Sequence, residues 1–343
     1  MRAARFNAPG RGVEIEEVPR PRPGPLDVLV RVEACGICLS DVHLFDGSIP
    51  PVIQPVTPGH EACGMIAELG ELVTNWTVGQ RVSLMGGRPC TKCPMCRGGR
   101  MESCQNLEIM GFHYDGAWAD YVVVPFYGVT PVPDGVVTEQ AAILADAVAT
   151  PYAAIGERAA LRPGESIGLW GIGGLGTHAV QIARLLGAGL VVAIDPLAGA
   201  RERALSVGAD VAIDPTAQDV VGEITALTSG NKLDIAIDLV GANAVMKQAV
   251  HCLGTRGRAV MVGLSLEPLE LGPGILLGVQ SQSVLGHLGY QKRHLDDLVT
   301  LLARGRLDLS GSISDILPLD DVADGVDRLA SKRDDPVRLI VRP

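Results

Sequence analysis

The sequence contains no run of like charges, no low-complexity tract and no internal repeat. Because 47% of its residues are hydrophobic and 20% are charged, we expect an ordered, globular protein. It also lacks any cluster of Lys and Arg, and its formal net charge is −10 at pH 7. That charge repels a phosphate backbone, so we expect no nucleic-acid partner.

The chain has no apolar segment long enough to span a bilayer, and its first residues lack the apolar stretch of a secretory signal. We therefore expect a cytoplasmic protein with no membrane partner. Disulfides are rare in that compartment, which favours an interpretation of the eight cysteines as metal ligands and buried thiols. Oxidised pairing of clustered cysteines is the alternative.

With 343 residues, the chain is long enough for about two domains. Its first part carries short β-rich runs, such as residues 28–33 and 121–125, separated by Gly and Pro. This pattern predicts a β-rich, barrel-like domain over residues 1–149.

From about residue 150 the pattern changes to alternating strands and helices, which predicts a parallel, doubly wound sheet over residues 150–286. The predicted strands are 166–170, 190–194, 211–213, 233–238 and 258–262, and the predicted helices include 175–186 and 200–207. The last segment, residues 287–343, holds a predicted helix over 294–304 and a closing strand over 337–341. We expect it to return to the first domain.

Four cysteines occur within fifteen residues as Cys90-x2-Cys93-x2-Cys96-x7-Cys104, and we call this set the ladder. Such spacing is typical of a short loop that wraps around one tetrahedral zinc ion. We therefore predict a zinc lobe over about residues 88–106.

A glycine-rich loop follows the predicted strand 166–170 and opens the next helix. It reads Gly171-Ile-Gly173-Gly174-Leu175-Gly176. In this context the glycines allow a tight turn and a close approach to a pyrophosphate, which predicts a dinucleotide-binding loop rather than a plain structural turn.

Asp195 lies nineteen residues after Gly176, at the end of the next predicted strand. A carboxylate there can accept hydrogen bonds from ribose hydroxyls and repels a 2′-phosphate, so NAD is favoured over NADP. A helix cap is the alternative role for Asp195, and Arg201 and Arg203 lie near enough in sequence to keep NADP open.

Two short motifs precede the ladder, and they read Gly36-Ile-Cys38-Leu-Ser40-Asp41-Val-His43 and Gly59-His60-Glu61. Together with the ladder and the glycine loop, in this order, they resemble the zinc-dependent medium-chain alcohol dehydrogenases. The resemblance spans essentially the whole chain. It implies a GroES-like catalytic domain, a Rossmann-type domain that binds NAD, and two Zn²⁺ per chain. It also implies a small-molecule alcohol or ketone substrate and a homodimer or homotetramer.

The resemblance implies that Cys38 and His60 bind the catalytic zinc, while the ladder holds a structural zinc that performs no chemistry. The family's third catalytic ligand is usually a cysteine, and Asp146 stands in its place here. An aspartate at this position resembles the secondary-alcohol dehydrogenase branch. A helix or turn cap without a metal contact is the alternative for Asp146.

Other site residues are also implied by the resemblance. Ser40 matches a hydroxyl relay beside the zinc, and His43 matches a histidine that passes the proton toward solvent. Asp41 is expected to orient His60, and Glu61 to lie behind the metal. Arg338, in the closing strand, is expected to reach the cofactor pyrophosphate. The alternatives are a turn hydroxyl for Ser40, surface salt bridges for the two acids and a solvent-facing arginine.

These observations favour an NAD- and zinc-dependent dehydrogenase that reversibly oxidises secondary alcohols to ketones. A polyol or sugar-alcohol dehydrogenase of the same family is the main alternative, and a non-enzymatic NAD- or zinc-binding protein is a more distant one. The candidate lining residues are apolar, which favours hydrophobic substrates; they are Leu39, Phe45, Phe112 and Leu288.

Overall fold

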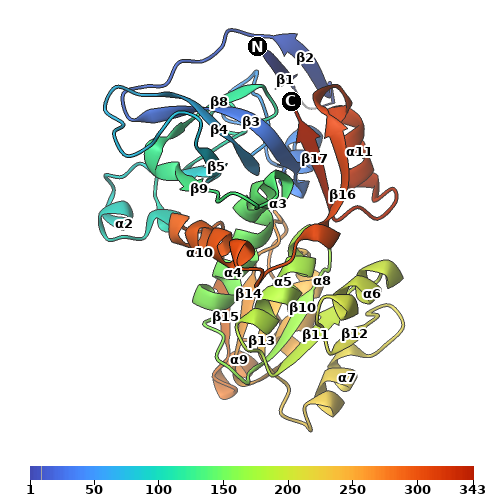
Figure 1. The fold of residues 1–343 in the computed structure, drawn as a ribbon. Coiled ribbons are helices and arrows are strands. Elements are labelled where there is room, and N and C mark those ends of the chain that lie inside the picture. The colour runs from blue at the N-terminus through green and yellow to red at the C-terminus, as the bar shows by residue number, and fades with distance from the viewer. Residues whose placement is uncertain (9) are drawn as a thin grey trace. The chain divides into compact units, whose positions relative to one another are not determined.

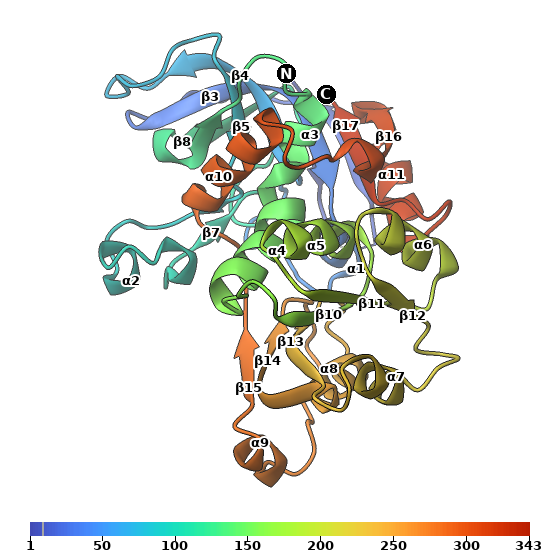
Figure 2. The ribbon, with the colours of Figure 1, turned by 60° about the horizontal axis from the view of Figure 1, so that its bottom comes forward.

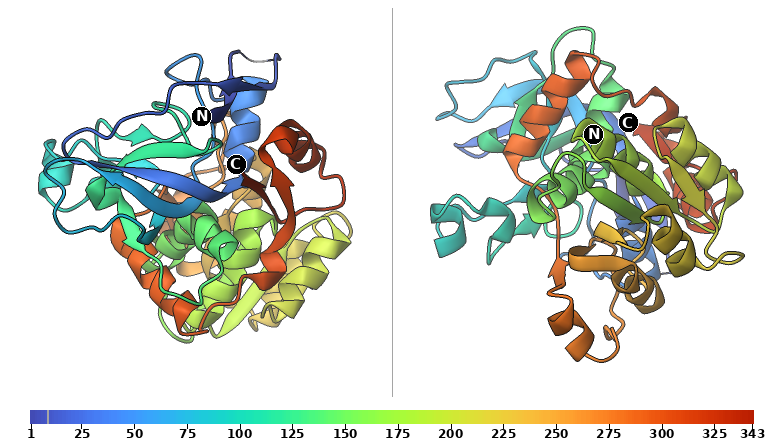
Figure 3. Two further views of the ribbon diagram at one scale, coloured as in Figure 1. Left: turned by 45° about the horizontal axis from the view of Figure 1, so that its top comes forward. Right: turned by 90° about the horizontal axis from the view of Figure 1, so that it is seen from below.

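The structure is a computed structural model that describes residues 1–8 and 10–343. The chain divides into two compact units, the first formed by Met1–Ala149 with Gly289–Pro343 and the second by Thr150–Leu288. Both chain ends lie in the first unit (Figure 3). Within the described residues, no helix combines the length and apolar character needed to cross a bilayer.

The first unit is built on a seven-stranded sheet in which β16, β17, β3, β4, β5 and β9 follow one another and β8 pairs with β3 (Figure 1). The bounds are β3 Asp27–Ile37, β4 Ala62–Leu69, β5 Arg81–Leu84, β8 Tyr121–Pro125, β9 Val129–Pro131, β16 Ile313–Pro318 and β17 Arg338–Arg342. The closing strand β17 runs antiparallel to β3, with Leu339 opposite Ile37 and Val341 opposite Cys35. The C-terminal segment thus completes the sheet of the N-terminal one.

Strand β3 is the centre of this sheet because it pairs with three neighbours and is buried along most of its length. Val28, Val30 and Val32 share one face, as side chains two apart in a strand do, and they pack in the core with Trp118. This packing fixes the end of β3, where the candidate metal-binding residues begin.

The remaining elements of the first unit surround this sheet. They are β1 Arg2–Phe6, β2 Val13–Glu17, α1 Leu39–Asp46, β6 Gly87–Arg88, α2 Pro94–Arg97, η1 Met101–Ser103, β7 Glu108–Ile109, η2 Phe126–Gly128, α3 Thr138–Ile143, η3 Leu144–Val148, α10 Lys292–Ala303, η5 Ser310–Ser312, η6 Leu319–Asp321 and α11 Val322–Ser331. Helix α4, Ala149–Ala153, spans the boundary between the units.

The second unit is a six-stranded, fully parallel sheet in the order β12-β11-β10-β13-β14-β15. Its strands are β10 Ser166–Trp170, β11 Leu190–Ile194, β12 Val211–Ile213, β13 Leu233–Asp238, β14 Leu253–Met261 and β15 Ser283–Gly286. Its helices are η4 Ala154–Arg158, α5 Gly174–Leu185, α6 Ala198–Ser206, α7 Val220–Leu227, α8 Asn243–His251 and α9 Ile275–Val279. Figure 2 shows α5 and α6 on one face of the sheet and α7 and α8 on the other. The predicted doubly wound sheet is confirmed.

Candidate active site and metal centres

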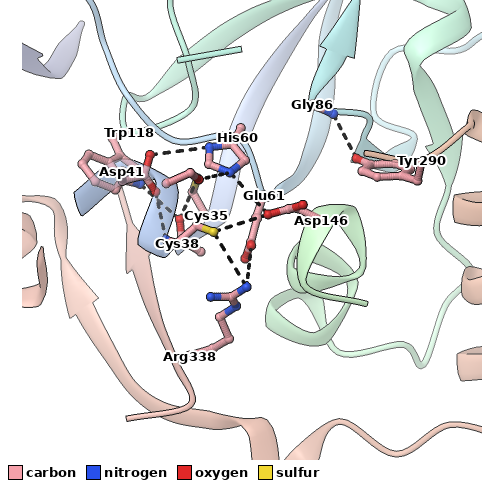
Figure 4. A network of polar contacts seen from close by, with 12 residues as sticks. Cys35, Cys38, Asp41, His60, Glu61, Gly86, Trp118, Asp146, Tyr290 and Arg338 are labelled. Carbon is pink, nitrogen blue, oxygen red and sulfur yellow. Dashed lines mark hydrogen bonds and ion pairs between the residues drawn. The ribbon is translucent and has the colours of Figure 1, made fainter. Parts of the chain in front are cut away.

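The first candidate metal-binding residue, Cys38, lies where β3 ends and α1 begins. It is the N-cap residue of α1 and has an extended backbone, with φ −109° and ψ 158°. The Cys38 backbone N–H donates to the Asp41 carboxylate at 2.9 Å, which fixes the turn into the helix. The Cys38 side chain is buried, and its sulfur atom faces Asp146 and Arg338 (Figure 4).

His60 and Glu61 precede β4 directly and are buried beside Cys38. The Gly36 N–H donates to the Glu61 carbonyl at 2.8 Å and so holds this segment against the end of β3. The imidazole lies between two side chains of the α1 turn: its Nδ1 is 3.5 Å from Asp41 Oδ1 and its Nε2 is 3.2 Å from Ser40 Oγ. This arrangement fixes the direction of the ring.

Asp146 comes from a distant segment, the break inside η3. Its backbone angles are φ 80° and ψ −69°, which lie near the rare and strained γ-turn conformation. The kink brings the Asp146 carboxylate to the two other residues: Oδ2 is 3.3 Å from Cys38 Sγ and 3.6 Å from His60 Nε2. Strain of this kind is typical of residues that the surrounding fold holds for a functional purpose.

The donor set of Cys38, His60 and Asp146 fits a zinc ion. Zinc binds thiolate, imidazole and carboxylate at about 2.0–2.3 Å, so tetrahedral ligand atoms lie about 3.3–3.8 Å apart. The separations from Asp146 fall in this range, and ligand atoms of all three residues and of Glu61 lie within 4.8 Å of one another. We call Cys38, His60 and Asp146 the mixed cluster.

The electrostatics of the mixed cluster favour a buried cation. Burial alone would lower the pKa of His60, but the Asp41 and Asp146 carboxylates outweigh it and raise this pKa well above its usual value. Burial raises the pKa of Cys38, although the Arg338 guanidinium acts in the opposite direction. A bound zinc ion would replace the protons of His60 and Cys38 as the positive charge here, because metal ligands are deprotonated.

Arg338 is buried, which excludes the alternative of a solvent-facing arginine. Its side chain is only 1% exposed, and its guanidinium lies 3.1 Å from Glu61 and 3.9 Å from Cys38 Sγ. Burial alone would lower the pKa of Arg338, but the charge of Glu61 raises it on balance. Arg338 therefore pairs with the Glu61 carboxylate, and its contact with the cofactor pyrophosphate stays a prediction.

The four ladder cysteines form a second cluster in the first unit, with sulfur atoms within 4.8 Å of one another. They are not paired in disulfides. The Cys96 and Gln105 backbone N–H groups lower the pKa of Cys93 to about 6, whereas burial and the neighbouring thiols raise that of Cys96 to about 12. Backbone donors stabilise thiolates here, while crowding opposes ionisation of all four thiols without a cation. A structural zinc with four cysteine ligands fits both observations.

In the second unit, the glycine loop lies between β10 and α5, with Gly174 and Leu175 in the first turn of the helix. Gly171 has φ 89°, a conformation that favours glycine. A Cβ on Gly176 would lie 1.9 Å from the Gly171 carbonyl oxygen, so only glycine allows the helix to pack this closely. Gly173 is the N-cap residue of α5, and its position leaves the backbone open to a ligand.

The Asp195 carboxylate, which follows β11, is turned toward the glycine loop. Its Oδ2 accepts the Ile172 N–H at 2.7 Å, and its Oδ1 accepts the Leu197 N–H at 2.8 Å. Arg201 donates to the Asp195 carbonyl at 2.9 Å, and Arg203 donates to the Ile172 carbonyl at 3.0 Å. Both arginines therefore lie beside the segment that would hold the adenosine ribose.

The positions of three aromatic residues relative to His60 could not be predicted from the sequence. Phe112 lies against the His60 ring, with centroids 6.0 Å apart, whereas the half-buried Phe45 packs against Phe6 and Trp118 at the edge of the core. The Tyr290 hydroxyl accepts the Gly86 N–H at 3.1 Å, close to His60. Tyr290 was not predicted as a site residue, because no local motif connects it to residues some two hundred positions earlier.

His43 lies in α1 with Nδ1 3.6 Å from Asp46.

Comparison with known proteins gives consistent results across the chain. Residues 24–134 match the alcohol dehydrogenase GroES-like domain, and residues 174–304 match the zinc-binding dehydrogenase domain. An NAD-dependent alcohol dehydrogenase from Sulfurisphaera tokodaii is 31% identical, over 96% of each chain.

Two solved structures share the fold over nearly their whole lengths. The alcohol dehydrogenase TADH from Thermus sp. ATN1 has a TM-score of 0.93 and 30% identity, and covers 100% of this chain and 99% of its own. The 2R,3R-butanediol dehydrogenase from Bacillus subtilis has a TM-score of 0.90 and 27% identity, with the same coverage. The chain belongs to the zinc-dependent medium-chain alcohol dehydrogenases, an oxidoreductase family that uses zinc and a nicotinamide dinucleotide.

Proposed function

We propose that this protein catalyses the reversible, NAD-dependent oxidation of secondary alcohols to ketones at the mixed cluster. The observation that carries the proposal is the convergence of three zinc-type donors beside a hydroxyl. Asp146 Oδ2 lies 3.3 Å from Cys38 Sγ and 3.6 Å from His60 Nε2, and Ser40 Oγ lies 3.2 Å from the same imidazole nitrogen.

Cys38, His60 and Asp146 would hold the catalytic zinc, and the ladder would hold the structural one. When bound, the catalytic zinc supplies Lewis acidity to an alcohol or carbonyl oxygen, and the nicotinamide accepts or returns the hydride. Ser40 would take the alcohol proton, because its hydroxyl lies beside the cluster and can accept one hydrogen bond while it donates another. His43, one helical turn later in α1, would pass that proton toward solvent.

The other residues of the site would hold these groups in place. Asp41 orients His60 through Nδ1, and Arg338 balances the buried charge of Glu61. In the second unit, the start of α5 would bind the cofactor pyrophosphate, and Asp195 would accept hydrogen bonds from the ribose hydroxyls. We propose NAD as the preferred cofactor on the basis of this carboxylate.

A spectrophotometric screen tests the proposal. Purified protein would be mixed with NAD or NADP and with primary, secondary and polyol substrates, and zinc would be measured on the same sample. We expect reduction of NAD, fastest with secondary alcohols. Failure to reduce either cofactor with any substrate would instead support a non-enzymatic dinucleotide- or zinc-binding protein.

A polyol dehydrogenase is the second candidate, and the neighbour from Bacillus subtilis with 2R,3R-butanediol in its name supports it. Faster turnover of sugar alcohols than of both simple secondary alcohols and vicinal diols in the same screen would favour this candidate. We also propose a homodimer or homotetramer, by analogy with the family, and light scattering on the purified protein tests that assembly.

A further inference from the structure

We propose that Tyr290 is a specificity-determining residue of this site. Its hydroxyl would donate a hydrogen bond to a second oxygen close to the reacting carbon, and would thereby favour diols and hydroxyketones over simple secondary alcohols and ketones. The inference rests on the proposed dehydrogenase function and narrows its substrate class.

The position of the Tyr290 hydroxyl is fixed by the backbone next to His60. The Gly86 N–H donates to this hydroxyl at 3.1 Å. Gly86 itself packs on His60, since a Cβ built there would lie 3.1 Å from the His60 carbonyl oxygen and 3.9 Å from the Tyr290 hydroxyl oxygen. Figure 4 shows the hydroxyl at the end of the ring that faces the mixed cluster. The phenol is thus anchored next to the backbone of a candidate zinc ligand.

In the part of the chain that the structure describes, the Tyr290 hydroxyl is engaged as a hydrogen-bond acceptor but not as a donor. A tyrosine hydroxyl can accept hydrogen bonds through its oxygen and donate one through its proton. The oxygen accepts from Gly86, and within residues 1–8 and 10–343 no protein group accepts the proton. Burial raises the pKa of Tyr290, and the negative charge of Asp146 adds to the effect. The phenol therefore remains protonated at neutral pH and keeps its capacity to donate.

A donor of this kind discriminates between substrates. A substrate with a second oxygen can accept the proton, whereas an apolar substrate leaves a desolvated donor unpaired. Phe112 contributes only an apolar ring next to His60, so it cannot perform this selection. Tyr290 provides the polar contact that the apolar residues predicted to line the site do not.

The test compares Tyr290→Phe with the wild-type protein on two matched substrates, 2-butanol and 2,3-butanediol, with NAD. We expect the wild-type protein to prefer the diol. The substitution should lower kcat/KM for the diol by about tenfold to hundredfold and change that for 2-butanol by less than about threefold. Tyr127→Phe is the matched control, because it also removes a phenol that donates a hydrogen bond, here to the Pro89 carbonyl at 3.0 Å. Tyr127→Phe should leave kcat/KM unchanged for both substrates.

The outcomes separate this inference from the proposed function. If Tyr290→Phe lowers kcat/KM equally for both substrates, Tyr290 only supports the fold, and the inference is wrong. An unchanged diol preference, with both alcohols still oxidised, also overturns it while the dehydrogenase function stands. If the wild-type protein oxidises no alcohol in the broader screen, the proposed function fails and the inference fails with it.

Discussion

The Arg338 guanidinium lies 3.1 Å from the Glu61 carboxylate, and both side chains are buried. Arg338 is the first residue of the closing strand β17, and Glu61 directly precedes β4. Strand β3 runs between these two strands in the sheet. The ion pair therefore joins the C-terminal strand to the segment that carries His60, and it places a fixed positive charge beside the mixed cluster.

Breaking this pair should cost much stability. Arg338→Met leaves the Glu61 charge buried and unpaired, so we expect a loss of about 3–5 kcal/mol in the free energy of unfolding. Glu61→Leu should cost a similar amount, and the double variant should cost clearly less than the sum of the two. Urea unfolding of the wild-type protein, the two single variants and the double variant, at one fixed zinc concentration, measures this double-mutant cycle. Additive losses would show that the two side chains do not interact.

The strained backbone of Asp146 gives a second prediction. Both Asp146→Gly and Asp146→Ala remove the carboxylate, but only glycine adopts φ 80° at little cost. We expect the glycine variant to be more stable than the alanine variant by about 1 kcal/mol, the reverse of their usual order inside helices. Thermal and urea unfolding of zinc-stripped samples measure this difference. A more stable alanine variant would contradict the assigned conformation.

Ser40 provides a test of the proton route. Ser40→Ala should lower kcat by about a hundredfold to ten-thousandfold, because the alcohol proton loses its acceptor. Ser40→Thr keeps a hydroxyl and should retain most of the activity. Zinc content should remain at two ions per chain in both variants, which separates a role in proton transfer from a role in metal binding. Equal activities of the alanine and threonine variants would exclude the relay.

The ladder should hold zinc without contributing to the reaction chemistry. Cys93→Ser should reduce the zinc content from two ions per chain to one and lower the thermal stability of the first unit, because a structural zinc contributes directly to folding. Cys252→Ala is the control, since this buried thiol lies in neither metal cluster. It should retain both ions. Loss of zinc from the control alone would contradict the assignment.

The parts of the site that are encoded locally could be predicted from the sequence. The ladder and the glycine loop are each short, continuous segments, because one segment supplies all the residues that surround one ion or one pyrophosphate. The parallel sheet followed from alternating strands and helices. Comparison with known proteins bears out the family, the fold and the two types of cofactor.

Other features depend on contacts between distant segments, which no local pattern encodes. The pairing of Arg338 with Glu61 arises because β17 and β4 flank β3, and the anchoring of Tyr290 arises because Gly86 packs on His60. The sequence showed an aspartate at position 146, but its positive φ is imposed by the fold. Phe45 was expected to line the site, and its half-buried ring packs against Phe6 and Trp118 at the edge of the core.

The catalytic metal site is tested most directly by the zinc content per chain of the wild-type protein and of Cys38→Ser, determined by elemental analysis on samples whose alcohol-dependent NAD reduction is also measured. We expect two zinc ions and activity in the wild-type protein, and one zinc ion with no activity in Cys38→Ser. A wild-type protein with a single zinc ion, or a variant that keeps both ions, would contradict the assignment of Cys38, His60 and Asp146 as the catalytic metal site.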